Sequence, residues 1–560
     1  MKLLDTRRLP GPSLIWPRPG AIADVQCTAA EAQALEPLWR TEARCALDAL
    51  GWEHERITSH RCSGGLSLVF SAPSDALYAA TEVIDYIWER CEQRLTGLIP
   101  VENQADFARL EALIAEEASP ALIALHQAAT EHRVSFLSDD EQVSVGYGTG
   151  SACWPVTELP APQALDWTRI HDIPVGIITG TNGKTTSVRL ASHVIRHAGH
   201  RAGMSSTDWI AVNGEIVEHG DYSGPEGART ILRQPEVEMA VLETARGGLL
   251  RRGIGVPRAT AALITNIAED HLGDFGSQNL QELLDIKWVV TRALGPDSRL
   301  LLNADDPLLV GKAKDSDITI DWFSLDPDHP RLRSSLAAGG RVFSVRDAHL
   351  VCMNGPTSET LCAVAAIPIT LGGAARHNVA NALGVCALTH ALGIPLDGIA
   401  AGLTSMQMAD NPGRCNLFTI DAFQVLVDFA HNPHGLAALF DIARALPARR
   451  RLLCFAQAGD RTDAQIRELA RGVWAIGLNK VIISELPKYY RGREPGEIFQ
   501  LLRDELLEAG AAPDQIEHQE SELDALHSAL NQAREGDLAI MLALADRDAI
   551  LDTLRNKAYE

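Results

Sequence analysis

The stretch Gly176-Ile-Ile-Thr-Gly-Thr-Asn-Gly-Lys-Thr-Thr186 decides the fold of this 560-residue chain. It follows an apolar run at 173–178 that predicts a buried strand, and it precedes residues 187–200, whose apolar spacing predicts an amphipathic helix. In such a context the backbone N–H groups of a glycine-rich loop and the N-terminus of the helix cradle phosphate. We therefore predict a nucleoside triphosphate site, with Lys184 reaching the β- and γ-phosphates and the Thr185 hydroxyl reaching Mg²⁺.

The loop is shorter than the general eight-residue phosphate-loop pattern. Ile178 stands five residues before Gly183, at the position where the general pattern has glycine. The alternative is a glycine-rich turn that contains Gly-Lys-Thr by chance, and the flanking strand and helix favour the phosphate loop. The residues predicted to contact ATP here are Gly180, Thr181, Asn182, Gly183, Lys184, Thr185 and Thr186.

Composition restricts the class of protein. There are 50 basic and 73 acidic side chains, so the net charge is −23, which argues against nucleic-acid binding through a basic surface. The ten cysteines contain no Cys-x-x-Cys pair, and this favours reduced thiols over a disulfide framework or a zinc site. No apolar run reaches membrane-spanning length, and the N-terminus lacks the apolar core of a signal peptide. We expect a cytoplasmic enzyme with no nucleic-acid or membrane partner.

The first 160 residues predict a small α+β domain. Its expected helices cover 31–50, 76–95 and 104–133, and its expected strands cover 66–71, 133–137 and 142–145. The Pro- and Ala-rich segment 152–168 predicts a linker.

Strands and helices alternate from residue 173 onward. The expected strands 175–179, 239–243, 261–265 and 299–303, with helices between most of them, indicate a parallel α/β sheet. After Asp410-Asn-Pro-Gly-Arg414 a second α/β unit follows, with strands at 424–429, 451–455, 481–484 and 538–542. We predict three domains, at 1–160, 161–411 and 412–560.

Further candidate site residues follow the predicted strands, where ligands bind in such sheets. Glu243 ends an apolar strand, and a carboxylate there suits Mg²⁺, although a helix N-cap or a solvated acid is the alternative. Asp270 and His271 are adjacent after the next strand, so the histidine could ligate a metal while the aspartate orients it or acts as base. Lys287 lies in a predicted helix, and its spacing alone favours a surface lysine.

The last unit contributes a charged cluster of its own. Arg414 begins the unit, and Asp428 and His431 follow its first strand. We expect these groups to close over a nucleotide from a second domain, which gives a site with a phosphate loop, one or two Mg²⁺ ions and a cationic clamp.

These motifs together resemble the Mur ligase superfamily, and more closely the Mur-ligase-like portion of cyanophycin synthetases. The resemblance covers about residues 170–560. The general motifs are Gly180–Thr186, Glu243, Asp270-His271, Lys287, His377-Asn378-Val-Ala-Asn381, Gly413-Arg414 and Asp428-Phe-Ala-His431. The finer ones are Leu242–Arg251, Asn303–Pro307, Pro412–Phe418, Asp428–Pro433 and Arg491–Glu497.

The resemblance implies a fold and a reaction. The middle domain would be a Mur-ligase P-loop ATPase and the last domain a Rossmann-like α/β domain. A substrate carboxylate would attack the γ-phosphate of ATP to form an acyl phosphate, which an amino-acid amine then converts to an amide. The residues implied to contact ATP in the second half are Asn378, Asn381, Arg414, Asp428 and His431. The residues implied to hold one or two Mg²⁺ ions are Thr185, Glu243, His271 and a carbamylated Lys287.

The resemblance also implies partners. Residues 1–160 resemble the N-terminal domain of cyanophycin synthetases at Arg8–Ser13 and Leu66–Phe70, and that domain is associated with polymer handling. The ATP-grasp domain of that group, which adds aspartate to the backbone, is missing after Val143–Gly148. We therefore expect a peptide or polymer acceptor with a free carboxylate, an amino-acid substrate and a separate ATP-grasp enzyme; homo-oligomerisation stays open.

Three functions stay in competition. The first is a ligase acting on an aspartate side chain of a cyanophycin-like polymer. The second is a Mur-type ligase for another acceptor, such as a nucleotide-linked peptide or a folate polyglutamate. The third is a non-catalytic paralogue, against which the intact Lys184, Thr185, Glu243 and His271 argue.

Overall fold

The computed structural model describes residues 1–100, 104–270, 272–273 and 275–559. The chain divides into two compact units. The first contains Met1–Ser344, Cys352–Glu359 and Leu383–Gly402, and the second contains Val345–Val351, Thr360–Ala382 and Leu403–Glu560. Within the described residues, no helix is both long and apolar enough to cross a membrane.

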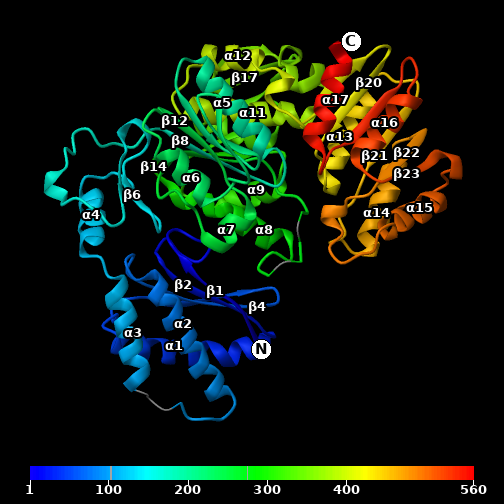
Figure 1. Cartoon of the computed structure of the whole chain (residues 1–560). Helices are drawn as coiled ribbons and strands as arrows, with labels where there is room; N and C mark the ends of the chain where they lie inside the picture. Colours follow the sequence, from blue (N-terminus) through cyan, green and yellow to red (C-terminus); the bar gives the residue numbers. More distant parts are fainter. Residues whose placement is uncertain (101–103, 271, 274, 560) are drawn as a thin grey trace. The chain divides into compact units, whose positions relative to one another are not determined.

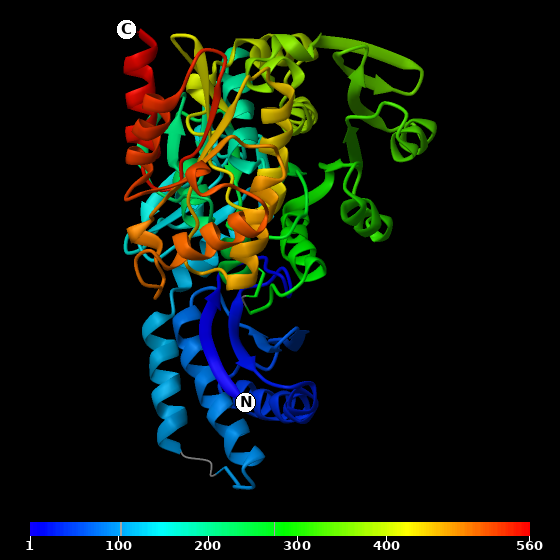
Figure 2. The same ribbon diagram turned by 90° about the vertical axis from the view of Figure 1, so that its right-hand side faces the viewer.

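The first unit begins with a four-stranded antiparallel sheet in the order β1-β2-β4-β3. Its strands are β1 (Lys2–Leu9), β2 (Gly20–Gln26), β3 (Ile57–Cys62) and β4 (Gly65–Ser71). Helices α1 (Ala29–Ala49) and α2 (Leu77–Leu95) bury alternate residues of β2 and β4 in one apolar core. Figures 1 and 2 show α2 running beside α3 (Gln104–Glu117).

A second small module follows, and it corrects two predictions. The helix expected over 104–133 is two helices, α3 and α4 (Pro120–Glu131), because Ser119 caps α4 and Pro120 occupies its first turn. The predicted pairing of β5 (Phe136–Ser138) with β6 (Gln142–Val145) is confirmed. The segment predicted as a linker begins with a third strand, β7 (Ala152–Pro155), which pairs antiparallel with β6.

The central sheet of the first unit carries the phosphate loop. Within the first unit its order is β11-β10-β9-β12-β8-β13-β14-β15-β16, and β9, β12, β8, β13, β14, β15 and β16 run parallel. The strands are β8 (Val175–Thr179), β9 (Ala202–Ser205), β10 (Trp209–Val212), β11 (Glu215–His219), β12 (Met239–Glu243), β13 (Ala259–Ile264), β14 (Leu294–Asn303), β15 (Ile320–Ser324) and β16 (Arg341–Arg346). The helices are α5 (Lys184–His197), α6 (Pro225–Leu232), α7 (Arg246–Arg252), α8 (Leu280–Trp288), α9 (Pro307–Lys312) and α10 (Pro330–Ala337). The predicted parallel α/β sheet is thus confirmed, with each predicted strand within a few residues of its observed position.

Four further elements, β17 (His349–Asn354), β18 (Thr357–Ala363), α11 (Arg376–Ala391) and α12 (Leu396–Ser405), come before the last sheet. That sheet has the order β19-β20-β24-β21-β22-β23, in which β19 runs antiparallel to β20 and the other pairings are parallel. Its strands are β19 (Asn416–Ile420), β20 (Phe423–Asp428), β21 (Arg451–Phe455), β22 (Lys480–Ser484), β23 (Ile516–Gln519) and β24 (Leu538–Leu542). Its helices are α13 (Pro433–Ala445), α14 (Asp463–Trp474), α15 (Glu497–Glu508), α16 (Glu522–Gln532) and α17 (Arg547–Tyr559).

Candidate active site

The loop between β8 and α5 needs glycine at two positions. Gly180 has a φ of 142°, and a Cβ there would lie 1.9 Å from Thr265 Oγ1. Gly183 has a φ of 87° and is the N-cap residue of α5. Because L side chains rarely adopt these conformations, the two glycines allow the sharp turn from the strand into the helix.

The segment after β13 holds the loop in place. Thr181 N donates to Asn266 O at 2.9 Å, and Asn182 N donates to Asn266 Oδ1 at 3.0 Å. Thr265 Oγ1 donates to Asn182 O at 2.6 Å. These bonds fix the backbone of the loop in the shape of a phosphate cradle.

The start of α5 presents cationic and hydroxyl groups at the loop. Lys184 is the first helical residue, and its Nζ donates to Thr181 O at 2.9 Å, so the ammonium lies over its own loop. The side chains of Thr185 and Thr186 are buried in the first turn. The positive end of the helix dipole and the Lys184 ammonium make this a suitable place for phosphate.

Glu243 is the last residue of β12 and pairs with Ile178 of β8. Its carboxylate is buried and accepts hydrogen bonds from Thr207 Oγ1 at 2.7 Å and Thr207 N at 3.2 Å. Since α7 begins after Ala245, Glu243 is neither a helix cap nor a solvated acid. The Glu243 carboxylate and the Thr185 hydroxyl are the hard oxygen donors that Mg²⁺ prefers, so these residues fit the predicted ion.

Lys287 corrects the expectation drawn from helical spacing. Its side chain is buried, and its Nζ donates to Gly180 O at 2.8 Å. Burial, followed by the nearby positive charge of Lys184, lowers the pKa of the amine well below its ordinary value. The surface-lysine prediction fails because α8 packs its apolar side against the rest of the unit and turns Lys287 toward the phosphate loop.

The predicted Asp270–His271 pair is only partly described. His271 lies outside the described residues, and its predicted role stays a prediction. Asp270 is half-buried, and its negative charge acts on Lys287 to raise the pKa of the amine, against the larger effect of burial. Over 1–100, 104–270, 272–273 and 275–559, no group of three or more His, Cys, Asp and Glu side chains is arranged to hold a metal ion.

Several contacts at this site were not predicted from the sequence. Thr207 orients Glu243, and Arg246 at the start of α7 acts on the pKa of Lys287 in the same direction as Lys184. Arg189 of α5 is buried, forms an ion pair with Asp208, and lies 4.0 Å from the ring centroid of Trp209. An arginine within an apolar helix face was an available signal for Arg189.

The second unit brings its predicted residues together around β20. Asp428 Oδ2 accepts from Cys415 N at 2.8 Å and from Cys415 Sγ at 3.3 Å. The Arg414 guanidinium lies 4.3 Å from the ring centroid of Phe429, and the His431 ring lies 5.2 Å from the same ring. Arg414, Asp428 and His431 therefore form one cluster at the end of a strand.

Asn378 and Asn381 lie one turn apart on α11. Asn378 Nδ2 donates to Ile369 O at 2.8 Å, and Asn381 Nδ2 donates to Asn378 Oδ1 at 3.1 Å. Both side chains are buried. The predicted site residues thus form one set in the first unit and one in the second.

The family model described as the Mur ligase middle domain matches residues 178–389, and the model described as the Mur ligase, glutamate ligase domain matches residues 413–543. A cyanophycin synthetase of Synechocystis sp. is 35% identical over 373 residues, which are 66% of this chain and 42% of that protein. The chain thus spans less than half the length of the first curated relatives it matches. A UDP-N-acetylmuramoyl-L-alanyl-D-glutamate–2,6-diaminopimelate ligase of Clostridium perfringens is 24% identical over 390 residues, 65% of this chain and 72% of that protein.

A solved structure shows the same fold. The structure of E. coli FolC in complex with DHPP and ADP superimposes on this chain with a TM-score of 0.51 at 17% identity. The matched region covers 69% of this chain and 89% of the FolC chain. At this identity the likeness concerns the fold alone.

Proposed function

This chain belongs to the Mur ligase family, and we propose that it is an ATP-dependent ligase that joins an amino acid to a substrate carboxylate, releasing ADP and phosphate. The observation that carries the proposal is the burial of Glu243 and Lys287 in one site with the phosphate loop. Glu243 suits the Mg²⁺ that accompanies a bound nucleotide, whereas nucleotide binding alone does not need a buried amine beside the loop.

The reaction follows from these groups. An oxygen of the substrate carboxylate attacks the γ-phosphorus of ATP, and the bond to the ADP oxygen breaks. Lys184 offsets the charge that develops on the phosphoryl oxygens. An amine then attacks the acyl carbon, phosphate leaves with the carboxylate oxygen, and the amine loses a proton as the amide forms. Bound Mg²⁺ would supply further charge neutralisation, held by Thr185 and Glu243, and the predicted roles of His271 and a second ion belong to the same proposal.

Lys287 suits the predicted carbamate. Its lowered pKa favours the neutral amine, which is the form that reacts with CO₂ to give a carbamate and a proton. The product is an anionic oxygen ligand beside Glu243. The further residues that we propose to contact ATP, all in the second unit, are Asn378, Asn381, Arg414, Asp428 and His431.

We propose an aspartate side chain of a cyanophycin-like peptide or polymer as the acceptor. The support is the 35% identity to a cyanophycin synthetase, against 24% to a muramoyl-peptide ligase. A separate ATP-grasp enzyme would supply the backbone, residues 1–160 would be the domain that meets the polymer, and the other two domains would be 161–411 and 412–560. The second candidate is a nucleotide-linked peptide acceptor. Its only support is that the chain covers 72% of the muramoyl-peptide ligase but 42% of the cyanophycin synthetase.

An isotope experiment tests the acyl phosphate directly. Poly-aspartate primers labelled with ¹⁸O in the carboxylates are incubated with the protein, Mg·ATP and a panel of amino acids. The released phosphate should carry one ¹⁸O for each amide formed. Phosphate without ¹⁸O would exclude an acyl phosphate, and turnover only with a UDP-linked peptide would replace the acceptor.

A further inference from the structure

The N-terminal sheet contacts two short helices beside the phosphate loop, at the C-terminal end of α7 and at the N-terminal end of α8. Helix α7 begins with Arg246, and α8 carries Lys287 in its last turn. The two helices pack against each other. With seven and nine residues they are too short to be stable alone, so contacts with other elements must fix their positions.

Arg7 of β1 caps the C-terminal end of α7. Its Nε donates to Arg251 O at 2.8 Å, and a terminal guanidinium nitrogen lies 3.5 Å from Leu250 O. These carbonyls belong to the last turn, where helical partners are missing and a cation is favoured. The cap is therefore supplied by a strand more than 240 residues away in sequence.

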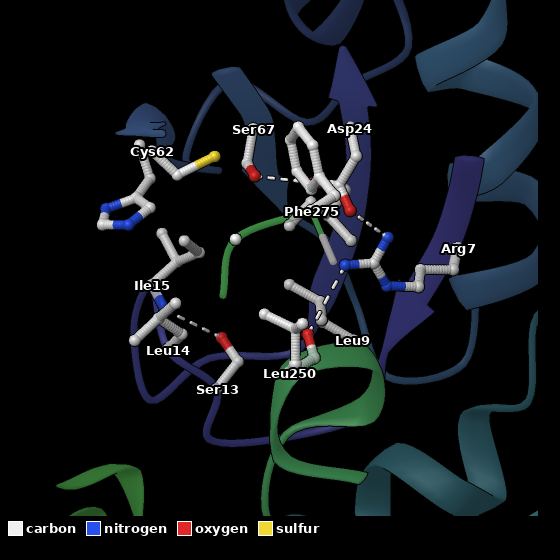
Figure 3. Close-up of a pocket in the computed structure, with 13 residues that line it drawn as sticks. Arg7, Leu9, Ser13, Leu14, Ile15, Asp24, Cys62, Ser67, Leu250 and Phe275 are labelled. Atoms are coloured by element: carbon white, nitrogen blue, oxygen red, sulfur yellow. Dashed lines mark hydrogen bonds and ion pairs between the residues drawn. The ribbon is translucent and has the colours of Figure 1, made fainter. Parts of the chain in front are cut away.

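A buried carboxylate orients Arg7. Asp24 of β2 accepts from Arg7 at 2.5 Å and from Ser67 Oγ of β4 at 2.6 Å. Figure 3 shows this chain of contacts from Ser67 through Asp24 and Arg7 to Leu250, beside a small pocket that Leu9, Ile15 and Phe275 also line. The guanidinium is thus fixed to three strands of the N-terminal sheet before it reaches α7.

The turn between β3 and β4 holds the start of α8. Ser63 N donates to Glu282 Oε1 at 2.6 Å, and Asn279 Nδ2 donates to Ser63 Oγ at 3.1 Å. Asn279 is the N-cap residue of α8, and the other oxygen of Glu282 accepts from Gln278 N at 2.8 Å. One residue of the N-terminal sheet thus joins the capping network of the helix that carries Lys287.

We propose that the N-terminal sheet positions the site: Arg7 and Ser63 hold α7 and α8, and through them set the places of Arg246 and Lys287. Arg7 and Ser63 are thus positioning residues, and the inference rests on the proposed ligase reaction. Most of the hydrogen bonds that hold the phosphate loop come from Thr265 and Asn266, and only the bond from Lys287 Nζ to Gly180 O comes from α8. Loss of the contacts that Arg7 and Ser63 make should therefore lower kcat far more than it weakens nucleotide binding.

The test compares Arg7→Ala with Arg8→Ala. Arg8 is the next residue of β1, and it binds Asp140 at 2.9 Å and lies 3.6 Å from the Tyr78 ring centroid. Arg8→Ala is the matched control, because it removes the same type of side chain from a residue that does not bind α7 or α8. The readouts are the Kd of Mg·ADP by calorimetry, kcat and KM for ATP in phosphate release, and amide hydrogen exchange of residues 246–252 and 280–288 in the full chain.

Arg7→Ala should lower kcat by about tenfold or more, since small misplacements of catalytic groups have effects of that size. It should leave the Kd of Mg·ADP within about twofold and speed exchange in 246–252. Arg7→Lys should restore part of kcat, and Arg8→Ala should change none of the three. Glu282→Gln, which keeps one acceptor oxygen, should lower kcat and speed exchange in 280–288, and it decides the matter if Arg7→Ala does not fold.

Equal effects of Arg7→Ala and Arg8→Ala, or equal factors on Kd and kcat, would overturn the proposal. Unchanged exchange in both helices would overturn it too. A wild-type chain without turnover would contradict the ligase reaction alone, because the binding and exchange measurements need no acceptor.

Discussion

Lys287 has its acid–base chemistry changed by burial. A lysine whose pKa falls on folding binds more protons in the unfolded chain than in the folded one at pH values between its two pKa values, so unfolding takes up protons there. Since the ordinary pKa is 10.5, the stability of the fold rises with pH as the solution approaches that value. This cost is the consequence of placing an amine where the reaction can use it.

We expect Lys287→Met to remove this pH dependence. The Tm of the wild type minus that of the variant should rise by roughly 1–4 °C per pH unit between pH 7 and pH 9. Scanning calorimetry in buffers of low ionisation enthalpy measures it. Lys314→Met, at an exposed lysine, is the control and should show no such trend. A difference for Lys287→Met that does not vary with pH would mean that the amine is charged in the folded protein.

At the level of single residues, the sequence predicted which side chains would lie together at the site, but not the contacts that fix them there. Lys184, Glu243 and Asp270 follow predicted strands, and parallel strand ends meet at one edge of a sheet. Spacing within α8 could not show that Lys287 meets Gly180, because that contact joins residues 107 positions apart. The contact of Thr207 with Glu243 could not be predicted for the same reason, since only the folded sheet brings the two residues together.

Among the elements, the turn from β8 into α5 has the strictest requirement for its sequence. Gly180→Ala would place a Cβ 1.9 Å from Thr265 Oγ1, which is the hydroxyl that holds Asn182 O. We expect the variant to weaken Mg·ADP binding by about tenfold or more. Isothermal titration calorimetry measures it.

Gly311→Ala is the matched control for this substitution. Gly311 lies in α9, has a helical φ, and an added Cβ would meet no atom within 4 Å. It should bind Mg·ADP as the wild type does, with stability unchanged or raised by about 0.5–1 kcal/mol. Normal binding by Gly180→Ala would show that the loop can relax and is not the rigid cradle described here.

The strongly periodic elements were predictable, and the short ones were not. The strands of the central sheet carry continuous apolar runs between turn residues, which few other structures explain. Strand β7 was missed because the prolines and alanines of 152–168 read as a linker, and a two-residue break at 118–119 divides a helical pattern that spacing alone continues. In both cases a local signal was present, but a competing pattern outweighed it.

At the scale of the whole molecule, the second unit is expected to take part in the reaction through Arg414. Arg414→Ala should lower kcat/KM for ATP by about tenfold or more, because a guanidinium that binds phosphate oxygens forms strong, charge-assisted hydrogen bonds. Steady-state phosphate release measures it. Arg444→Ala, at an exposed arginine of α13 paired with Asp441 at 2.9 Å, is the control. Unchanged kinetics for Arg414→Ala would remove this residue from the nucleotide site.

The family could be predicted from the sequence, whereas the contacts of the N-terminal sheet with α7 and α8 could not. The motifs of 170–560 occur in a fixed order, and the matches to the middle and C-terminal Mur ligase domains confirm that prediction. The contacts of Arg7 and Ser63 with α7 and α8 join residues more than 200 positions apart and have no motif. Long-range polar contacts of this kind follow only from the folded chain.

The most direct test of the central claim is whether ATP turnover depends on both substrates. The purified chain is incubated with Mg·ATP, poly-aspartate primers and each amino acid in turn, and ADP, phosphate and product mass are measured together. We expect one ADP and one phosphate for each amide formed, and no turnover when either substrate is omitted. Lys184→Ala should lower kcat by about a hundredfold or more, and Lys314→Ala should leave it unchanged. ATP hydrolysis that ignores acceptor and amine, or full turnover by Lys184→Ala, would contradict the central claim.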